Sequence, residues 1–309
     1  MKLFEMIAKF RADFDTDHRC VVVVVVGPTA SGKSELAVQL ADRFDGEVVN
    51  ADSMQVYSGM AIGTAKPSAD LLERARHHLL GMVAPDVNFT AADFQQEARR
   101  VISEIHDRGR MPIVVGGTGL YIRALLGGLA ESPGGDEDYR AELTTIANRY
   151  GNLVLLERLE KIDPETAARL HVNDRFRIIR ALEVYHQSGR PFSAYQTGFV
   201  EEWCISLKIG IDVSREELYR RINSRVEQMI ADGLVAEVQS LLAAGYHPGL
   251  KALRSIGYKE ICAYLAGELS LAEAIELIKR DSRRYAKRQL TWFKKEPDIN
   301  WVEYRDIFR

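Results

Sequence analysis

The stretch Gly27–Ser34, GPTASGKS, follows six consecutive valines at Val21–Val26, and this junction decides the fold. A short run of β-branched apolar residues is typical of a strand that is buried on both faces of a parallel sheet. The loop after it matches the pattern G-x-x-x-x-G-K-[ST], and an amphipathic helix pattern follows at Ser34–Phe44. Strand, glycine-rich loop and helix in this order predict a phosphate-binding loop.

The residues of this loop are Gly27, Pro28, Thr29, Ala30, Ser31, Gly32, Lys33 and Ser34. Backbone N–H groups and the positive end of the helix dipole favour a phosphate there. In such loops the lysine, here Lys33, supplies a point charge to the terminal phosphates, and the Ser34 hydroxyl is the usual Mg²⁺ ligand. We therefore expect Mg²⁺ as a cofactor. Loops of this kind are nucleotide-binding, most often ATP-binding, and the pattern alone does not say whether ATP is the ligand here.

Apolar runs that read as strands alternate with helical patterns over much of the chain. The strand-like runs are Cys20–Val26, Glu47–Asn50, Pro112–Val115 and Ile205–Asp212. This alternation predicts an α/β fold, a P-loop NTPase-like core whose parallel sheet is flanked by helices. From Asp136 to about Gln187 the pattern is helical without a strand, which indicates an inserted all-helical domain. We place the core at 1–130 and 200–309 and the insertion at 131–199, and we expect helices from Ser214 to the end.

Composition excludes several classes of protein. The chain has 309 residues, 46% apolar and 28% charged, with a formal net charge of −3, so any nucleic acid must be bound by local basic patches. No apolar run is long enough for a membrane span, and acidic residues near the start argue against an export signal. The three cysteines are far apart in sequence and fit neither a disulfide framework nor a zinc site. We expect a cytoplasmic protein, and a monomer by default.

The carboxylate pattern is unusual for an ATP enzyme. The apolar run Met111–Val115 leads into Gly116-Gly117-Thr118-Gly119, where a typical P-loop NTPase has an acidic residue that serves the Mg²⁺ ion. The nearest acid after a core strand is Asp52. Its position at the carboxyl end of a strand favours a catalytic role, whereas its residue type equally suits a helix N-cap. The spacing leaves both interpretations open.

Six motifs in series point to one family. They are GPTASGKS, NADSMQVYSGMAIGTAKP (Asn50–Pro67), GGTGLYIRAL (Gly116–Leu125), RALEVY (Arg180–Tyr185), SIGYKE (Ser255–Glu260) and YAKRQLTWF (Tyr285–Phe293). Together they closely resemble tRNA dimethylallyltransferase, also called tRNA isopentenyltransferase. The resemblance runs from about Val21 to Phe293. No Cys or His follows Phe293, so the resemblance is to the bacterial type, without the zinc-finger tail of eukaryotic members.

The resemblance implies a prenyl transfer. A dimethylallyl group would pass from dimethylallyl diphosphate to N6 of the adenosine at tRNA position 37, next to the anticodon, and diphosphate would leave. The phosphate loop would then hold a prenyl diphosphate, which explains why no acid for phosphoryl transfer is needed. The implied catalytic residues are Asp52, Lys33, Thr118 and Arg225. Asp52 would take the proton of the amine, while Lys33 and Arg225 would stabilise the leaving group.

The resemblance also implies contacts with the anticodon stem-loop of tRNA. The implied tRNA-binding residues are Asp52, Ser53, Met54, Gln55, Thr118, Phe176, Arg177, Ile178, Ile179, Arg180, Arg254, Ser255, Ile256, Gly257, Tyr258 and Lys259. The target base would have to leave its stack to reach the loop, and the helical insertion would help to hold the RNA. His77-His78 departs from the family pattern, because Leu80-Gly81 replaces the expected Ile/Val-Asp, and we assign this pair no role.

Two other functions compete with this interpretation. A P-loop kinase for a small molecule would share the loop, the Mg²⁺ ion and the sheet. The absence of an acid at Gly116–Gly119 and the basic stretch Lys279–Lys295 both argue against it. A non-catalytic RNA-binding protein with a relic phosphate loop is the second alternative. Intact Lys33, Ser34 and Asp52 argue against that one.

Overall fold

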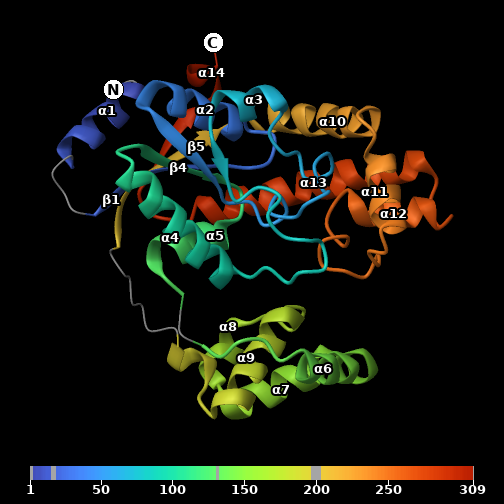
Figure 1. Ribbon diagram of the computed structural model, residues 1–309. Helices are drawn as coiled ribbons and strands as arrows, with labels where there is room; N and C mark the ends of the chain where they lie inside the picture. The colour runs from blue at the N-terminus through green and yellow to red at the C-terminus, as the bar shows by residue number, and fades with distance from the viewer. Residues whose placement is uncertain (1–2, 15–18, 130–131, 196–202, 309) are drawn as a thin grey trace. The chain divides into compact units, whose positions relative to one another are not determined.

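The structure is a computed structural model that describes all residues except 1–2, 15–18, 130–131, 196–202 and 309. It divides into two compact units (Figure 1). The first unit combines Met1–Gly127 with Glu202–Arg309, and the second comprises Gly128–Glu201. No helix in the described part of the chain is long and apolar enough to cross a membrane.

A single parallel sheet organises the first unit. Its strands are β1 (Cys20–Val26), β2 (Gly46–Asn50), β3 (His77–His78), β4 (Met111–Gly116), β5 (Cys204–Asp212) and β6 (Ile299–Glu303). They lie in the order β3-β2-β4-β1-β5-β6, and every neighbouring pair is parallel. Strand β1 is central and its last five valines are buried, as the valine run predicts. The predicted α/β fold with a parallel sheet is confirmed.

Strand β6 contradicts the expectation that only helices follow Ser214. Its five residues, INWVE, are only half-buried and pair with β5 at the edge of the sheet. A run this short becomes a strand because β5 offers a partner, and its own pattern is too weak to predict it. The two-residue strand β3 was missed for the same reason.

Helices cover both faces of the sheet (Figure 1). One buried cluster packs α1 (Leu3–Asp13), α2 (Lys33–Phe44), the first half of α10 (Arg215–Ala231) and α14 (Tyr304–Ile307) against the sheet. The other cluster involves α4 (Ala91–Asp107), α5 (Gly119–Gly127), α11 (Leu234–Ala243), α12 (Tyr258–Leu265) and α13 (Leu271–Phe293). A short helix, α3 (Ala69–Arg74), precedes β3. Apolar side chains thus cover the sheet on both faces, as a parallel sheet requires.

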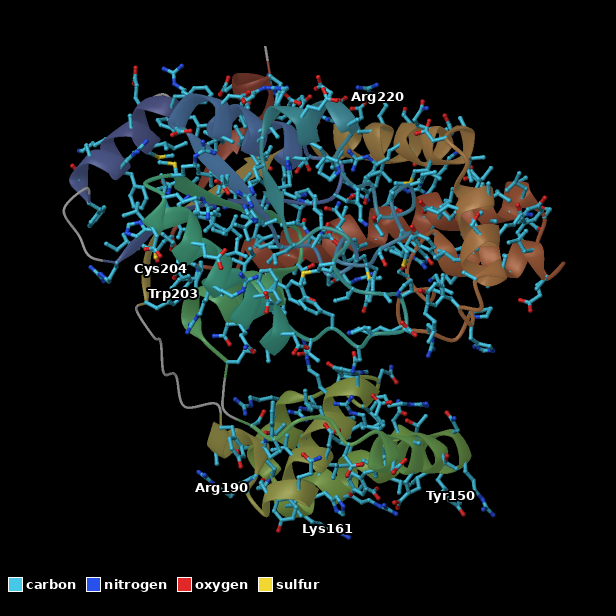
Figure 2. The ribbon with its side chains drawn as sticks, in the orientation of Figure 1. Tyr150, Lys161, Arg190, Trp203, Cys204 and Arg220 are labelled. Carbon is cyan, nitrogen blue, oxygen red and sulfur yellow. The ribbon has the colours of Figure 1, made fainter. Side chains whose placement is uncertain are left out.

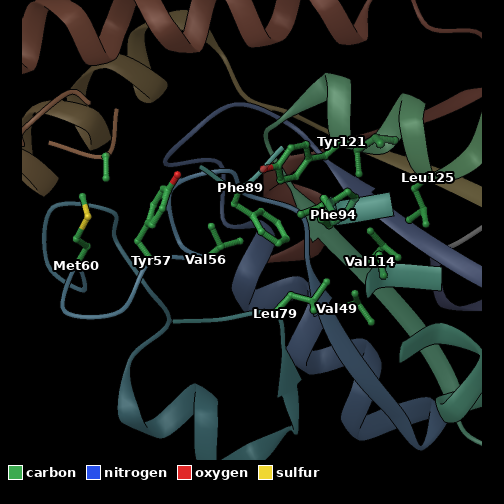
Figure 3. Close-up of a cluster of buried hydrophobic side chains, with 14 of the residues drawn as sticks. Val49, Val56, Tyr57, Met60, Leu79, Phe89, Phe94, Val114, Tyr121 and Leu125 are labelled. Carbon is green, nitrogen blue, oxygen red and sulfur yellow. The ribbon is translucent and has the colours of Figure 1, made fainter. Parts of the chain in front are cut away.

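Aromatic side chains anchor the segment that follows β2. The rings of Phe94 and Tyr121 stack with their centroids 4.2 Å apart (Figure 3). Val56, Tyr57 and Met60, from the segment after β2, are fully buried in the same cluster. This packing holds the backbone that carries Asp52 against the sheet, so the residues between Asp52 and Met60 have a defined course despite lacking regular structure.

The second unit is helical throughout its described part. It contains α6 (Glu137–Tyr150), α7 (Asn152–Ile162), α8 (Pro164–Arg169), α9 (Arg175–Ser188) and the 3₁₀ turn η1 (Phe192–Tyr195). Leucines and isoleucines from α6, α7 and α9 form its own core. Glu183 is fully buried there, and its carboxylate accepts hydrogen bonds from the Asp136 N–H and from the guanidinium groups of Arg140 and Arg180. This unit therefore has both an apolar core and an internal ionic network.

A second buried carboxylate joins β2 to its neighbours in the first unit. Glu47 is 1% exposed and lies 2.6 Å from Nε2 of His78 and 2.7 Å from Nη2 of Arg108. Nη1 of Arg110 lies 3.4 Å away. Burial alone would raise the pKa of Glu47, but the hydrogen bonds from His78 and Arg108 outweigh burial and hold its pKa below the usual range.

We predict that Glu47→Gln destabilises the protein in a pH-dependent way. A folded-state pKa below the ordinary 4.5 means that the ionised carboxylate stabilises the fold above that pH and that this contribution is lost as the pH falls. The substitution should cost roughly 2–3 kcal/mol at pH 7. The difference from wild type should shrink below pH ~4.5 in urea titrations. Glu104→Gln, which breaks an exposed pair with Arg100, should change stability by under about 0.5 kcal/mol. Equal effects of the two changes would contradict this.

Candidate active site

A cavity of about 530 Å³ opens at the carboxyl ends of the central strands. The phosphate loop, the segment after β2 and the end of β4 line it, together with α10, α13 and the segment Arg254–Gly257. In open α/β sheets this end of the strands is where ligands bind. The fold therefore brings five of the six motifs to one place: the phosphate loop, the segment after β2, the glycine turn after β4, the start of SIGYKE and the YAKRQ stretch of α13.

The phosphate loop has the backbone that its sequence predicts. Gly32 adopts φ 88°, a left-handed conformation that favours glycine, and caps the N-terminus of α2. A Cβ at Gly32 would also lie 2.9 Å from the Phe308 ring. Lys33 donates from Nζ to the Pro28 carbonyl oxygen at 2.6 Å, so it lies folded back over the loop. Ser31 is fully buried, and its hydroxyl has no hydrogen-bond partner in the described part of the chain.

Charges of both signs meet at the cavity floor. Burial lowers the pKa of Lys33 to about 7; the Asp52 carboxylate opposes this shift, and the positive charge of Arg225 adds to it. Burial also raises the pKa of Asp52, although the hydrogen bond from the Met54 N–H and the charge of Lys33 act to lower it. The pKa of Arg225 is lowered by burial and by its neighbour Arg221. Lys33, Asp52 and Arg225 thus share one poorly solvated site, although the cavity leaves each side chain partly open to solvent.

Asp52 caps a turn and not a helix. Its Oδ1 accepts a hydrogen bond from the Met54 N–H at 2.9 Å, and the residues that follow form turns. The sequence left open a capping role for Asp52 at a helix, and the structure shows a cap of a turn instead. It does not exclude a chemical role, because Asp52 also lines the cavity beside Lys33 and has a raised pKa.

Thr118 lies just behind the cavity wall. Its Oγ1 accepts from the Ser53 N–H at 3.0 Å and lies 3.3 Å from the Ser53 hydroxyl oxygen. The Tyr285 hydroxyl lies close to the side chains of Thr118 and Gln289. The glycine turn after β4 and the Asp52–Ser53 segment are therefore joined by hydrogen bonds, and Tyr285 of α13 lies next to this junction.

Gln289 and Tyr285 are site residues that our sequence analysis did not single out. Gln289 is 5% exposed; its Oε1 accepts from the Thr29 N–H at 2.8 Å, and its Nε2 donates to the Gly117 carbonyl oxygen at 2.9 Å. It thus ties the phosphate loop to the glycine turn. The available signal was their spacing of four residues within YAKRQLTWF, which places both side chains on one face of a helix.

The predicted tRNA-binding residues of the first unit divide into two groups. Those that line the cavity are Asp52, Ser53, Met54, Gln55, Arg254, Ser255, Ile256 and Gly257. Three others, Thr118, Tyr258 and Lys259, do not line it. Tyr258 is fully buried and donates its hydroxyl hydrogen to Glu237, and the exposed Lys259 lies 3.4 Å from the carboxylate of Asp281. The side chain of Tyr258 therefore supports the fold and does not reach a ligand.

The predicted tRNA-binding segment of the second unit also divides. Ile178 and Ile179 are buried in the core of that unit, because the helical period turns them inward. Arg180 donates to Glu183, to the Ser132 hydroxyl and to the Pro133 carbonyl oxygen. The side chain of Phe176 is 76% exposed, and that of Arg177 is 63% exposed and paired with Asp174 at 3.0 Å. An RNA contact made by side chains of this segment would therefore rest on Phe176 and Arg177.

The residues present fit a Mg²⁺ ion that is shared with a ligand. Among the described residues, no group of three or more His, Cys, Asp or Glu side chains converges to hold a metal. In phosphate sites, however, Mg²⁺ commonly uses one or two protein ligands together with waters and phosphate oxygens. Ser34 lines the cavity directly after Lys33 and supplies one such oxygen.

We predict that Lys33→Met stabilises the free protein around neutral pH. Because the pKa of Lys33 falls to about 7 on folding, the unfolded chain binds the proton more tightly, and wild-type stability rises with pH above 7. The stability advantage of Lys33→Met should be largest below pH 7 and should shrink towards pH 9 in urea titrations. Lys161→Met changes an exposed lysine of the second unit (Figure 2) and should run parallel to wild type. If the unfolding free energy of Lys33→Met changed with pH in parallel with that of wild type, the lowered pKa of Lys33 would be excluded.

Comparison with known proteins identifies the family of this chain. The profile of the family described as IPP transferase matches residues 55–296. A tRNA dimethylallyltransferase 2 from Geotalea uraniireducens is 63% identical over 95% of this chain and 96% of its own length. The tRNA dimethylallyltransferase of Geobacter sulfurreducens is 62% identical over 92% of both chains.

Solved structures show the same relationship. The tRNA isopentenylpyrophosphate transferase of Bacillus halodurans superposes with a TM-score of 0.68 at 44% identity and covers 93% of this chain and 90% of its own. A eukaryotic dimethylallyltransferase acting on tRNA gives a TM-score of 0.75 at 30% identity, over 92% of this chain and 74% of that one. The chain therefore belongs to the tRNA dimethylallyltransferase family, the IPP transferases.

Proposed function

We propose that this protein transfers a dimethylallyl group from dimethylallyl diphosphate to N6 of the adenosine at tRNA position 37. The observation that carries the proposal is the shared cavity, which Asp52 and the phosphate loop both line. Within it, the positive charge of Lys33 interacts with the Asp52 carboxylate. One end of this cavity suits an anionic leaving group, and the other offers a base to an incoming amine. The membership of the family supports the same reaction.

On the donor side, the C1–O bond of the substrate breaks, and negative charge develops on the diphosphate. The loop N–H groups, Lys33 and Arg225 stabilise that charge in a site that is already organised. When bound through Ser34, Mg²⁺ would neutralise part of the charge on the diphosphate oxygens. Substrate binding favours the charged form of Lys33, because an anion beside an ammonium raises its pKa.

On the acceptor side, N6 of adenosine attacks C1 and must lose a proton. Asp52 takes that proton, and its raised pKa makes it a stronger base than an ordinary exposed aspartate. Thr118 positions Asp52 indirectly, since it holds the N–H of Ser53. The products are N6-(dimethylallyl)adenosine in tRNA, diphosphate and one proton.

We also propose how the RNA is bound. The reacting base must be unstacked from the anticodon loop, because its amine cannot reach the cavity from within a stack. Ser53, Met54 and the Arg254–Gly257 segment line the cavity, which supports a contact with the unstacked nucleotide. In the second unit, Phe176 offers a stacking surface and Arg177 a cation for the anticodon stem-loop.

The compartment and assembly state are part of the proposal. All three cysteines, Cys20, Cys204 and Cys262, are free thiols, which suits the reducing cytoplasm. A single chain contains every residue assigned to the donor and acceptor sides, so we propose that the protein acts as a monomer.

We predict that Asp52→Asn lowers prenyl transfer to unmodified tRNA by at least about a hundredfold, the scale of a positioned acid–base group. Asparagine keeps an oxygen that can accept the Met54 N–H but cannot take the proton. The assay follows labelled dimethylallyl diphosphate into tRNA in the presence of Mg²⁺. Asp70→Asn, an exposed aspartate of α3, serves as the control and should retain wild-type activity.

The outcomes separate the roles of Asp52. A large loss in Asp52→Asn supports the base. Near wild-type activity in Asp52→Asn together with a large loss in Asp52→Ala would reduce Asp52 to a turn cap. A folded wild type that labels no tRNA but turns over ATP with a small acceptor would overturn the proposed function in favour of a kinase.

A further inference from the structure

Helix α10 presents two arginines to the cavity, one helical turn apart. Arg221 and Arg225 both line it, at a spacing that places them on one face of the helix. Their neighbour Arg220 lies on the outer face (Figure 2). It is 69% exposed and forms two hydrogen bonds with Glu217, at 2.7 and 2.9 Å. The same helix thus carries one arginine that is paired on the surface and two that point inward.

The inward pair lacks the partners that would normally accompany it. Nη1 of Arg221 is buried and has no hydrogen-bond partner among the described residues. Within the same part of the chain, neither Arg221 nor Arg225 forms an ion pair with a carboxylate within 4.0 Å. Like charges four residues apart on a helix repel each other, and a buried donor without an acceptor costs stability. A site that keeps this arrangement is organised for an anion.

Tyr304 determines where the Arg221 guanidinium lies. The Cζ atom of Arg221 is 4.1 Å from the centroid of the Tyr304 ring, a close cation–π contact. The Tyr304 ring also lies against the phosphate loop, because a Cβ added to Gly32 would be 3.2 Å from it. Phe308, whose ring centroid is 4.7 Å from that of Tyr304, covers Gly32 from the same side. The end of the chain therefore places Arg221 beside the start of α2.

We propose that Arg221 is a second diphosphate-binding arginine, positioned by Tyr304 to act with Arg225 on the leaving group. This inference rests on the proposed function and extends it to a residue outside the phosphate loop. A guanidinium presents a planar set of N–H donors that fits two phosphate oxygens at once. Two such groups one turn apart match the two phosphates of the substrate. Both would stabilise the charge that develops as the C1–O bond breaks.

Binding of inorganic diphosphate tests this directly, without tRNA or prenyl transfer. The full-length protein is titrated calorimetrically with diphosphate and Mg²⁺. We expect Arg221→Ala to weaken binding by about 10- to 100-fold, the range for charge-assisted hydrogen bonds to phosphate. Arg221→Lys should recover only part of the loss, because it keeps the charge but not the fork. The matched control Arg220→Ala should stay within about twofold of wild type.

A second variant keeps the test valid if Arg221→Ala does not fold. Tyr304→Leu leaves both arginines in the chain and removes only the aromatic surface, so diphosphate binding should weaken by about threefold or more. In steady-state assays both variants should raise KM for dimethylallyl diphosphate and lower kcat, with KM for tRNA unchanged. A general structural defect would instead lower the melting temperature and affect both substrates.

The outcomes also separate this inference from the proposed function. Folded Arg221→Ala that binds diphosphate like wild type overturns the inference, whatever the activity. So does a selective rise in KM for tRNA, which would assign Arg221 to an RNA phosphate. If wild type binds diphosphate tightly, Arg221→Ala does not, and no prenyl transfer occurs with any tRNA, the arginine site stands and the proposed function fails.

Discussion

The close approach of Gly116 to Ala51 is the constraint on which the rest of the site depends. A Cβ on Gly116 would lie 2.1 Å from the Ala51 carbonyl oxygen, so only glycine allows the ends of β2 and β4 to meet. The Ala51 N–H donates to the Val115 carbonyl oxygen at 2.7 Å across this junction. Because the two backbones touch here, Asp52 and Thr118, which follow each strand, are brought together. Without that contact the carboxylate would have no fixed relation to the phosphate loop.

In the free protein, the cavity holds cations that have no bound anion to balance their charge. Lys33, Arg221 and Arg225 share a poorly solvated space with the Asp52 carboxylate. Lysine relieves the repulsion by losing its proton easily, whereas arginine cannot deprotonate and stays charged. The free protein is therefore less stable than an electrically balanced core would be. A bound diphosphate reverses this penalty, so the same charges that weaken the free fold strengthen the complex.

The sequence allowed the local features of this site to be predicted but not the distant ones. The phosphate loop, its strand and its helix are contiguous, so pattern and turn chemistry specify them together. Gln289 contacts Thr29 across 260 positions of sequence, and no local pattern relates the two. The same applies to Tyr304 and Arg221, which belong to different helices, and to β6, which becomes a strand only beside β5. A family resemblance names motifs, but it did not show that Tyr258, Ile178 and Ile179 have buried side chains.

The way the chain leaves and re-enters the core explains how a helical unit can be inserted without disturbing this site. The core breaks off after α5, at Gly127, and resumes with Trp203 just before β5. The Trp203 indole N–H donates to the Leu125 carbonyl oxygen, and Arg99 lies over the Trp203 ring with Cζ 4.9 Å from its centroid. The two ends of the insertion are thus joined within the core itself (Figure 2 labels Trp203). Strand β5 is paired with β1 from its first residue, over Cys204–Gly210, so the sheet resumes directly after the insertion. The proposed chemistry can then reside in the core, while the inserted unit serves the proposed contact with RNA.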